Sequence, residues 1–229
     1  MTSTKQTRPR VFAIVPAAGQ SRRMGRAKQL LDCGGRPMLF AVLEPLTAAD
    51  VAGVALVTNR SIVERIDVIE TGGPSRQTLV GSAGPGLQTW AGESERETFI
   101  VYNDDPSSEM IDSVRIGLAA WDERESIDRQ DGFLVCPGDH PGIPTKDLNQ
   151  CIRAFIDTPG RIVIATRGGR CGHPIIVPAD LTTFVESSAC DGGLNALRHA
   201  FPDRVVHVAT VSEAVIRDVD TPDDYEALS

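Results

Sequence analysis

VFAIVPAAGQSRRMGRAKQLLDCGGRPML, residues 11–39, is the stretch from which the architecture can be read. Its apolar run Val11–Val15 breaks at Pro16 into small residues and then Gly19. A β-branched run of this kind predicts a buried strand that feeds a tight turn, where backbone N–H groups can approach a ligand. Amides with cations close behind them suit polyphosphate, because the amides supply directional donors and the cations supply charge.

The distribution of charge supports an anion site in this segment. Residues 1–31 contain seven Lys or Arg and no acid, whereas the remaining 16 of the 23 basic residues face all 31 acids. An acidic protein that keeps one segment basic is expected to hold an anion there. The alternative is an ordinary strand-to-helix turn on a basic surface. The spacing matches neither the Walker loop nor the dinucleotide fingerprint, since Lys28 follows Gly25 by three residues and no G-x-G-x-x-G is present.

Composition bounds the class of protein. The 229 residues are 41% apolar and 24% charged, which is typical of one or at most two α/β domains with a substantial core. A net charge of −8 argues against nucleic acid or an anionic membrane as the main partner. Five cysteines without a C-x-x-C pair indicate neither a zinc site nor a redox motif. Their odd number, with no signal-peptide core before Pro16, predicts a cytoplasmic protein with reduced thiols.

Apolar runs alternate with stretches of helical periodicity. Strands are expected at Val11–Val15, Val54–Val57, Phe99–Tyr102, Phe133–Cys136, Ile162–Ala165, Ile175–Val177, Val205–Val208 and Val215–Val219. Helices are expected near Pro37–Leu46, Ser108–Trp121, Thr145–Ile156, Gly193–Ala200 and Pro222–Leu228. The alternation predicts an α/β fold, a three-layer α/β/α sandwich around a mostly parallel, twisted sheet. We expect a flexible tail over 1–10 and a single domain over 11–229, with an insertion around 60–97, where periodicity is weak.

AAGQSRRMGRAKQLL followed by GGRPML resembles the signature of the MobA-like nucleotidyltransferases. Within that family it is most similar to the molybdenum cofactor cytidylyltransferases. The resemblance implies a nucleotide-diphospho-sugar transferase-like fold and transfer of a nucleoside monophosphate from an NTP to a phosphorylated acceptor, with release of pyrophosphate. The implied NTP is CTP ahead of GTP, and the implied acceptor is Mo-molybdopterin, with a molybdoenzyme or chaperone as a possible partner. It places the backbone of Ala17, Ala18 and Gly19 on the nucleotide, with Ser21 and the catalytic cations Arg22 and Lys28 on the triphosphate.

Two acids are candidates for metal ligands. Asp139 lies in CPGDHPGIP just past the expected strand Phe133–Cys136, and the family has a metal-binding aspartate there. Asp220 follows the expected strand Val215–Val219 and matches the family's second metal-ligand carboxylate. Both are expected to converge on one Mg²⁺ that bridges the triphosphate, because Mg²⁺ takes one or two carboxylates plus phosphate oxygens. The alternative for Asp139 is a turn aspartate that caps the next helix; His140 is interpreted as a neighbour that shapes the loop.

The remaining motifs concern the two substrates. GGRCGHPIIVP, residues 168–178, resembles the family element in which Gly172 allows close approach and His173 meets the acceptor, although a lone histidine is as often structural. Asn59, Asn103 and Ser113 match nucleotide-binding positions. In NDDPSSEMIDSVRIGL, residues 103–118, the acids Glu109 and Asp112 depart from the family pattern and leave the base open.

Three alternatives to cytidylyl transfer to Mo-molybdopterin therefore remain. One is guanylyl transfer, because Asn59–Arg60 matches the N-R pair of guanylyltransferase relatives. Another is nucleotidyl transfer to a sugar or alcohol phosphate. The third is a non-catalytic nucleotide- or pterin-binding protein, suggested by the altered 107–113 segment and the insertion.

Overall fold

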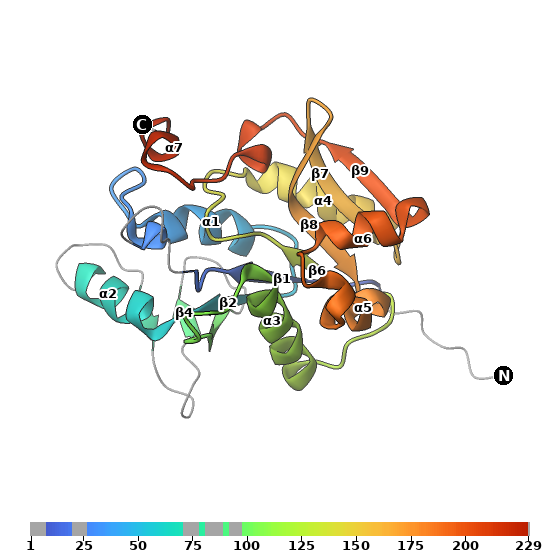
Figure 1. Ribbon diagram of the computed structural model, residues 1–229, viewed down its shortest axis with the longest axis horizontal. Helices are drawn as coiled ribbons and strands as arrows, with labels where there is room; N and C mark the ends of the chain where they lie inside the picture. The colour runs from blue at the N-terminus through green and yellow to red at the C-terminus, as the bar shows by residue number, and fades with distance from the viewer. Residues whose placement is uncertain (1–7, 20–26, 71–77, 81–88, 92–97, 229) are drawn as a thin grey trace.

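The computed structural model describes residues 8–19, 27–70, 78–80, 89–91 and 98–228 (Figure 1). Its strands are β1 (Val11–Pro16), β2 (Val54–Thr58), β3 (Thr78–Val80), β4 (Thr89–Ala91), β5 (Thr98–Tyr102), β6 (Gly132–Val135), β7 (Ile162–Arg167), β8 (Arg170–Pro178) and β9 (Val205–Ala209). They form one sheet in the order β3-β4-β5-β2-β1-β6-β8-β7-β9. Among these described strands, only β4 and β8 run against the other seven. The prediction of a mostly parallel sheet is confirmed.

Helices cover both faces of the sheet. They are α1 (Met38–Thr47), α2 (Arg60–Glu70), α3 (Met110–Arg124), α4 (Thr145–Asp157), α5 (Thr182–Glu186), α6 (Asn195–Ala200) and α7 (Pro222–Glu226). Successive side chains of β1 point to opposite faces, as pleating requires. Val11, Ala13 and Val15 join the cluster that contains apolar residues of α1, α2 and α4, whereas Phe12 and Ile14 join the cluster of α3, α5 and α6. The α/β/α sandwich predicted from the alternation is therefore the observed architecture.

The predicted strand Val215–Val219 is wrong. Its first part lies in a 3₁₀ helix, η5 (Glu213–Ile216), and no described strand pairs with the rest. Val215 and Val219 are both fully buried, but in different clusters. Val215 belongs to the cluster on the face of the sheet that α4 covers, whereas Val219 packs with Leu31 and Met38. The apolar residues therefore anchor this segment at two separate places and do not form a strand that pairs with the sheet.

The region 60–97 contains more regular structure than its periodicity indicates. It begins with helix α2, whose Ile62, Val63 and Ile66 are buried in the core, and it includes β3 and β4, which pair antiparallel and extend the sheet beyond β5. Ile62, Val63, Ile66 and Ile69 follow helical spacing, so the expectation of weak periodicity was wrong for residues 60–70. Residues 71–77, 81–88 and 92–97 of the predicted insertion lie outside the described residues.

The predicted tail is anchored at its last residue. The Arg10 guanidinium donates to Glu125 (3.0 Å) and Asp131 (2.9 Å), and its backbone N–H also donates to Asp131 (2.8 Å). Arg10 is thus fixed by these contacts, residues 1–7 lie outside the described part, and the flexible tail over 1–10 stays a prediction. All five cysteines are free. In the described part of the chain, no helix combines the length and apolar character that crossing a bilayer requires.

Candidate active site

The loop after β1 is fixed by side chains that hold its carbonyl groups. Gln29 Nε2 donates to the carbonyl oxygens of Ala17 (3.0 Å) and Gly19 (3.1 Å), and Asn59 Nδ2 donates to that of Ala18 (3.0 Å). Thr58 Oγ1 adds a second donor to Ala17 at 3.3 Å. Side chains of the protein therefore hold three successive carbonyl groups, which fixes the backbone at residues 17–19.

Gln29 is a site residue that the sequence analysis missed. It is buried, with 3% of its surface exposed, and it follows Lys28 in the 3₁₀ helix η1 (Lys28–Leu30). A neutral amide buried beside a predicted catalytic lysine needs polar partners, and the loop carbonyls supply them for Nε2, whereas Oε1 is buried without a hydrogen-bond partner among the described residues. The neighbours of Gln29 in the sequence do not indicate this role, because the fold alone brings the carbonyl groups of Ala17 and Gly19 to its side chain.

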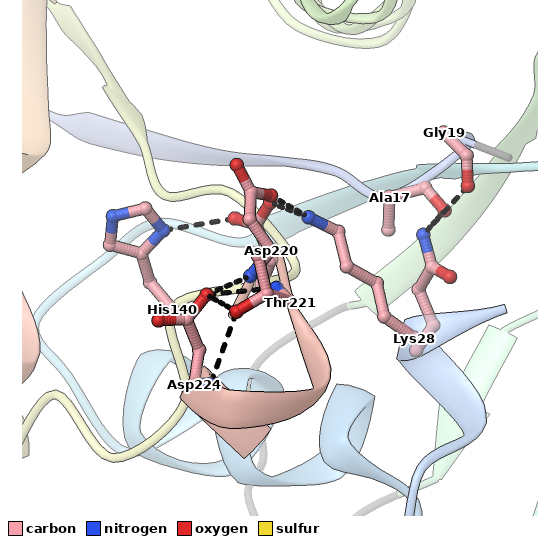
Figure 2. A network of polar contacts seen from close by, with 9 residues as sticks. Ala17, Gly19, Lys28, His140, Asp220, Thr221 and Asp224 are labelled. Atoms are coloured by element: carbon pink, nitrogen blue, oxygen red, sulfur yellow. Dashed lines mark hydrogen bonds and ion pairs between the residues drawn. The ribbon is translucent and has the colours of Figure 1, made fainter. Parts of the chain in front are cut away.

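Lys28 joins the two predicted metal ligands. Its Nζ lies 2.6 Å from Asp139 Oδ2 and 2.6 Å from Asp220 Oδ1 (Figure 2). Asp139 comes from the loop after β6 and Asp220 from the segment before α7, so positions far apart in the sequence meet at one ammonium group. Asp139 does not cap α4, because the N-cap position is Pro144 and no side chain caps there.

The charges of this triad stabilise one another. Burial disfavours the charged form of Lys28, but the charge of Asp139 and the hydrogen bonds that Lys28 donates to both acids outweigh it and raise the pKa of Lys28 above its ordinary value. Burial likewise disfavours ionised Asp139, yet the hydrogen bond from His140 and the charge of Lys28 hold the pKa of this carboxyl well below its usual range. At neutral pH the site therefore contains an ammonium between carboxylates.

Asp220 is held through its neighbours in the chain. The backbone N–H of Val219 donates to the carbonyl oxygen of Asp139 (3.0 Å), and the N–H of Asp220 donates to Asp224 Oδ2 (3.2 Å). Asp224 and Thr221 form the capping box of α7, with Pro222 in the first turn, at the start of the helix expected near Pro222–Leu228 (Figure 2). The helix start thus keeps Asp220 next to Asp139 without a strand.

His140 and His173 form a pair of rings behind Asp139. His140 Nδ1 lies 2.9 Å from Asp139 Oδ1, and the two imidazoles meet edge to face with centroids 4.8 Å apart. Burial lowers the pKa of His173 to about 4, so this ring is neutral at pH 7. Its Nδ1 faces the carbonyl oxygen of Val135 at 3.4 Å.

Gly172 has a partner within the chain. A Cβ atom at this position would lie 1.8 Å from the carbonyl oxygen of Val215, so only glycine allows η5 to pack against β8. The close approach predicted for Gly172 exists, but it is made by the chain's own backbone. A contact of Gly172 or His173 with the acceptor stays a prediction.

The predicted nucleotide-binding residues divide between two cavities that share Ala18 and Gly19. A cavity of about 190 Å³ is lined by the loop, Lys28, Ser113 and Asp139. A larger one of about 580 Å³ is lined by Asn59, Asn103 and their neighbours Arg60, Asp104 and Asp105. Ser21 and Arg22 lie outside the described residues.

Several of these polar residues also have intramolecular roles. Asn103 Nδ2 donates to Ser113 Oγ (3.0 Å), and Asn59 Oδ1 accepts from the backbone of Ile62 in the first turn of α2 (3.0 Å). The Asp112 carboxylate accepts from the N–H of Glu109 (2.8 Å), the residue just before α3. The departure at Asp112 therefore has a structural explanation, while Glu109 lines the smaller cavity.

The donor set fits a divalent cation that is shared with a substrate. Two carboxylates converge on Lys28, whose ammonium marks a position where positive charge is stabilised. Within the described residues, no group of three or more His, Cys, Asp or Glu gathers around one point. Two acids without further protein ligands suit Mg²⁺, which is usually bound by one or two carboxylates together with phosphate oxygens.

Comparison with known proteins finds a matching family and curated relatives. Residues 13–206 match the model of the MobA-like NTP transferase domain. Among curated proteins, the 2-C-methyl-D-erythritol 4-phosphate cytidylyltransferase of Frankia casuarinae is 30% identical over 187 residues, which are 80% of this chain and 53% of that protein. Its counterpart in Azoarcus sp. is 34% identical over 127 residues, or 49% of each. The chain thus spans about half the length of these relatives.

Solved structures extend the likeness over the whole fold. Rv0371c from Mycobacterium tuberculosis aligns with a TM-score of 0.73 and 22% identity over 97% of this chain and 98% of that one. A complex of the same protein with manganese aligns with a TM-score of 0.68, again at 22% identity, over 96% and 97% of the two chains. At this identity the likeness concerns the fold alone.

Proposed function

Because the chain belongs to the MobA-like NTP transferase domain family, we propose that it is a nucleotidyltransferase dependent on a divalent metal. It would transfer a nucleoside monophosphate from an NTP to a phosphorylated small molecule and release pyrophosphate. The observation that carries the proposal is the contact of Lys28 Nζ with both Asp139 and Asp220, 2.6 Å from each. This contact lies beside the loop that Gln29 and Asn59 hold in place.

Each part of the site has a role in such a transfer. Asp139 and Asp220 would hold the metal, proposed to be Mg²⁺, which neutralises charge on the triphosphate when bound. Lys28 would move from its carboxylate partners to phosphate oxygens and stabilise charge that develops on the leaving pyrophosphate. The loop Ala17–Gly19 would orient the nucleotide for in-line attack. Arg22 and Ser21 are proposed as further triphosphate contacts on the resemblance of their motif.

No general base needs to be assigned. The nucleophile is a phosphate oxygen of the acceptor. A phosphate monoester carries a charge of about −1.5 to −2 at pH 7, because its second pKa is about 6. The protein therefore has to bind the two substrates, orient them and neutralise their charge. This demand fits a site built from one ammonium and two carboxylates.

CTP is the proposed nucleotide, because the curated relatives are cytidylyltransferases. GTP is the second candidate, since Asn59 and Arg60, which match the N-R pair of guanylyltransferase relatives in sequence, both line the larger cavity. The cavity there carries charges of both signs, Arg60 with Arg65 and Asp104 with Asp105, so its lining offers donors and acceptors to either base.

Two acceptors are proposed, each on a different observation. The curated relatives support 2-C-methyl-D-erythritol 4-phosphate, a small sugar-alcohol phosphate. The resemblance of AAGQSRRMGRAKQLL and GGRPML supports Mo-molybdopterin, and with it a cytoplasmic place beside molybdoenzymes or their chaperones. Both acceptors present a phosphate monoester, so the same loop and cations can serve either.

A pair of measurements tests the proposal. Thermal shift with each of the four NTPs, with and without Mg²⁺, should show metal-dependent stabilisation by CTP that exceeds the stabilisation by the other three. Pyrophosphate release from CTP should then require one of the two acceptors. Stabilisation by CTP without turnover on either acceptor would favour the nucleotide- or pterin-binding protein over the enzyme. An absence of any NTP effect would contradict both.

A further inference from the structure

His140 lies at the back of the candidate metal site, where no role has been assigned to it beyond shaping the loop. It follows Asp139 directly, and its side chain is only 10% exposed. The two oxygens of Asp139 serve different donors: Oδ1 lies 2.9 Å from His140 Nδ1, and Oδ2 lies 2.6 Å from Lys28 Nζ. One oxygen of Asp139 thus accepts from the imidazole, and the other faces the ammonium group of Lys28.

The direction of this hydrogen bond follows from chemistry. An ionised carboxylate can only accept, so His140 Nδ1 carries the proton and donates it to Asp139 Oδ1. A carboxylate held through one oxygen by a fixed donor loses the rotation that would exchange its two oxygens. The position of Oδ2 then depends on the position of the His140 ring.

The His140 ring is itself held from a neighbouring strand. It meets the ring of His173 on β8 edge to face, at 4.8 Å between centroids and 74° between planes. His173 faces the carbonyl oxygen of Val135 at the end of β6 (3.4 Å). The contacts thus connect the sheet, through His173 and His140, to the Asp139 carboxylate, and they fix the position of the group that donates to this carboxylate.

We propose that His140 is a positioning residue that orients Asp139, so that Oδ2 stays directed at the cation of the site. The inference rests on the proposed metal dependence and adds the group that prepares its ligand. Without the donor, Asp139 could rotate or give both oxygens to Lys28, and the metal would bind more weakly. Partners of this kind typically change metal affinity by about 10- to 100-fold when they are lost.

Two substitutions separate hydrogen bonding from packing. His140→Phe keeps an aromatic ring against His173 and removes the N–H donor. His140→Asn places an amide N–H near the position of Nδ1 and removes the ring. Affinity for Mn²⁺ in the presence of CTP, followed by the electron paramagnetic resonance signal of free Mn²⁺, reports on the metal without turnover.

The proposal expects His140→Phe to bind Mn²⁺ about 10- to 100-fold more weakly than the wild type. His140→Asn should stay close to wild-type affinity even where its melting temperature falls. With turnover as a second readout, His140→Phe should raise the Mg²⁺ concentration needed for half-maximal rate more than it lowers kcat. Should His140→Phe fail to fold, His140→Met supplies a second side chain without a donor.

The opposite order, with loss in His140→Asn and retention in His140→Phe, would overturn the proposal in favour of ring packing. Equal losses in both, or no loss in either, would also overturn it. Failure of the proposed function gives a different result: the wild-type protein would then bind no Mn²⁺ with any NTP, whereas failure of the inference alone leaves wild-type binding intact.

Discussion

Two arms of the molecule bring acids to the same ammonium group, and they are built in different ways. The Asp139 arm (residues 132–140) continues a central strand of the sheet, and its carboxylate is 22% exposed and held by His140. The Asp220 arm (residues 213–226) has no strand, and its carboxylate is 41% exposed. The sheet sets the first acid in place, whereas the second is placed by contacts with other segments.

The Asp220 arm depends on the Asp139 arm for its position. Val219 donates its N–H to the carbonyl oxygen of Asp139 and packs against Leu31 and Met38, which follow Lys28. The other anchor of the Asp220 arm is Val215 in η5, whose carbonyl oxygen packs against Gly172. We therefore expect changes in the shared contacts to loosen the Asp220 arm first.

Removal of the shared charge should have the largest effect. Lys28→Met keeps most of the side-chain volume, and we expect turnover to fall by about 10²- to 10³-fold, the usual cost of losing one group that stabilises transition-state charge. Hydrogen exchange should rise at the amides of Val219 and Asp220 and stay unchanged in β6. Lys146→Met, at an exposed lysine, is the matched control and should behave as the wild type. Unimpaired turnover in Lys28→Met would contradict the proposed function.

Neutralisation of each acid separately compares the arms directly. Asp139→Asn should lower the free energy of unfolding by about 2–3 kcal/mol, because it leaves the largely buried Lys28 charge without its better-held partner. Asp220→Asn should lower it by less than about 1 kcal/mol, since solvent screens the more exposed pair. Urea denaturation at pH 7 measures both, and equal losses would show that the arms are equivalent.

The anchor of the Asp220 arm can be displaced without touching the acid. In Gly172→Ala the new Cβ would lie 1.8 Å from Val215 O, so η5 must move. We expect a loss of about 1–3 kcal/mol in the free energy of unfolding, as for other overpacked sites, together with weaker Mn²⁺ binding. Gly192→Ala is the control, because nothing lies within 4 Å of its added methyl group. Stability equal to that of the control would contradict the packing assigned to Gly172.

The ring pair behind the Asp139 arm predicts a pH dependence. The pKa of His173 is about 4 in the folded chain against an ordinary 6.5, so between these values the unfolded chain binds the extra proton. The free energy of unfolding should therefore fall as pH drops from 7 to 5, by about 2 kcal/mol through this group. His173→Phe should remove that part of the fall. Denaturation curves at both pH values check it, and an unchanged difference would argue that His173 is not buried as a neutral ring.

Much of the fold could be predicted because local patterns and tertiary packing agree. The runs at Val11 and Val54 are buried on both faces, so continuous hydrophobicity correctly indicated central parallel strands. The capping residues Thr221 and Pro222 fix the start of α7 by local chemistry alone. The strands β3 and β4 were missed because they are only three residues long, whereas the helical spacing of Ile62, Val63, Ile66 and Ile69 in α2 was present in the sequence and was overlooked.

The candidate site divides in the same manner. Lys28, Asp139 and Asp220 could be chosen from their motifs, and the structure brings them together. Gln29 and His140 could not be assigned, because their roles consist of contacts with a carbonyl or carboxylate whose position only the fold supplies. Gly172 was read as an approach to a ligand, since a sequence does not say which backbone passes close by.

By itself the sequence determined the alternating layers, the basic loop after β1 and the identity of the three charged residues. The layers and the loop follow from periodicity, glycine geometry and side-chain chemistry, which act over a few neighbouring residues, whereas the three charged residues were chosen because their motifs resemble those of the MobA-like family. Only the tertiary structure decided that Val215 and Val219 anchor a segment without a strand, and that one oxygen of Asp139 belongs to His140. Those outcomes depend on which distant segments pack together, and that is settled by burial over the whole chain.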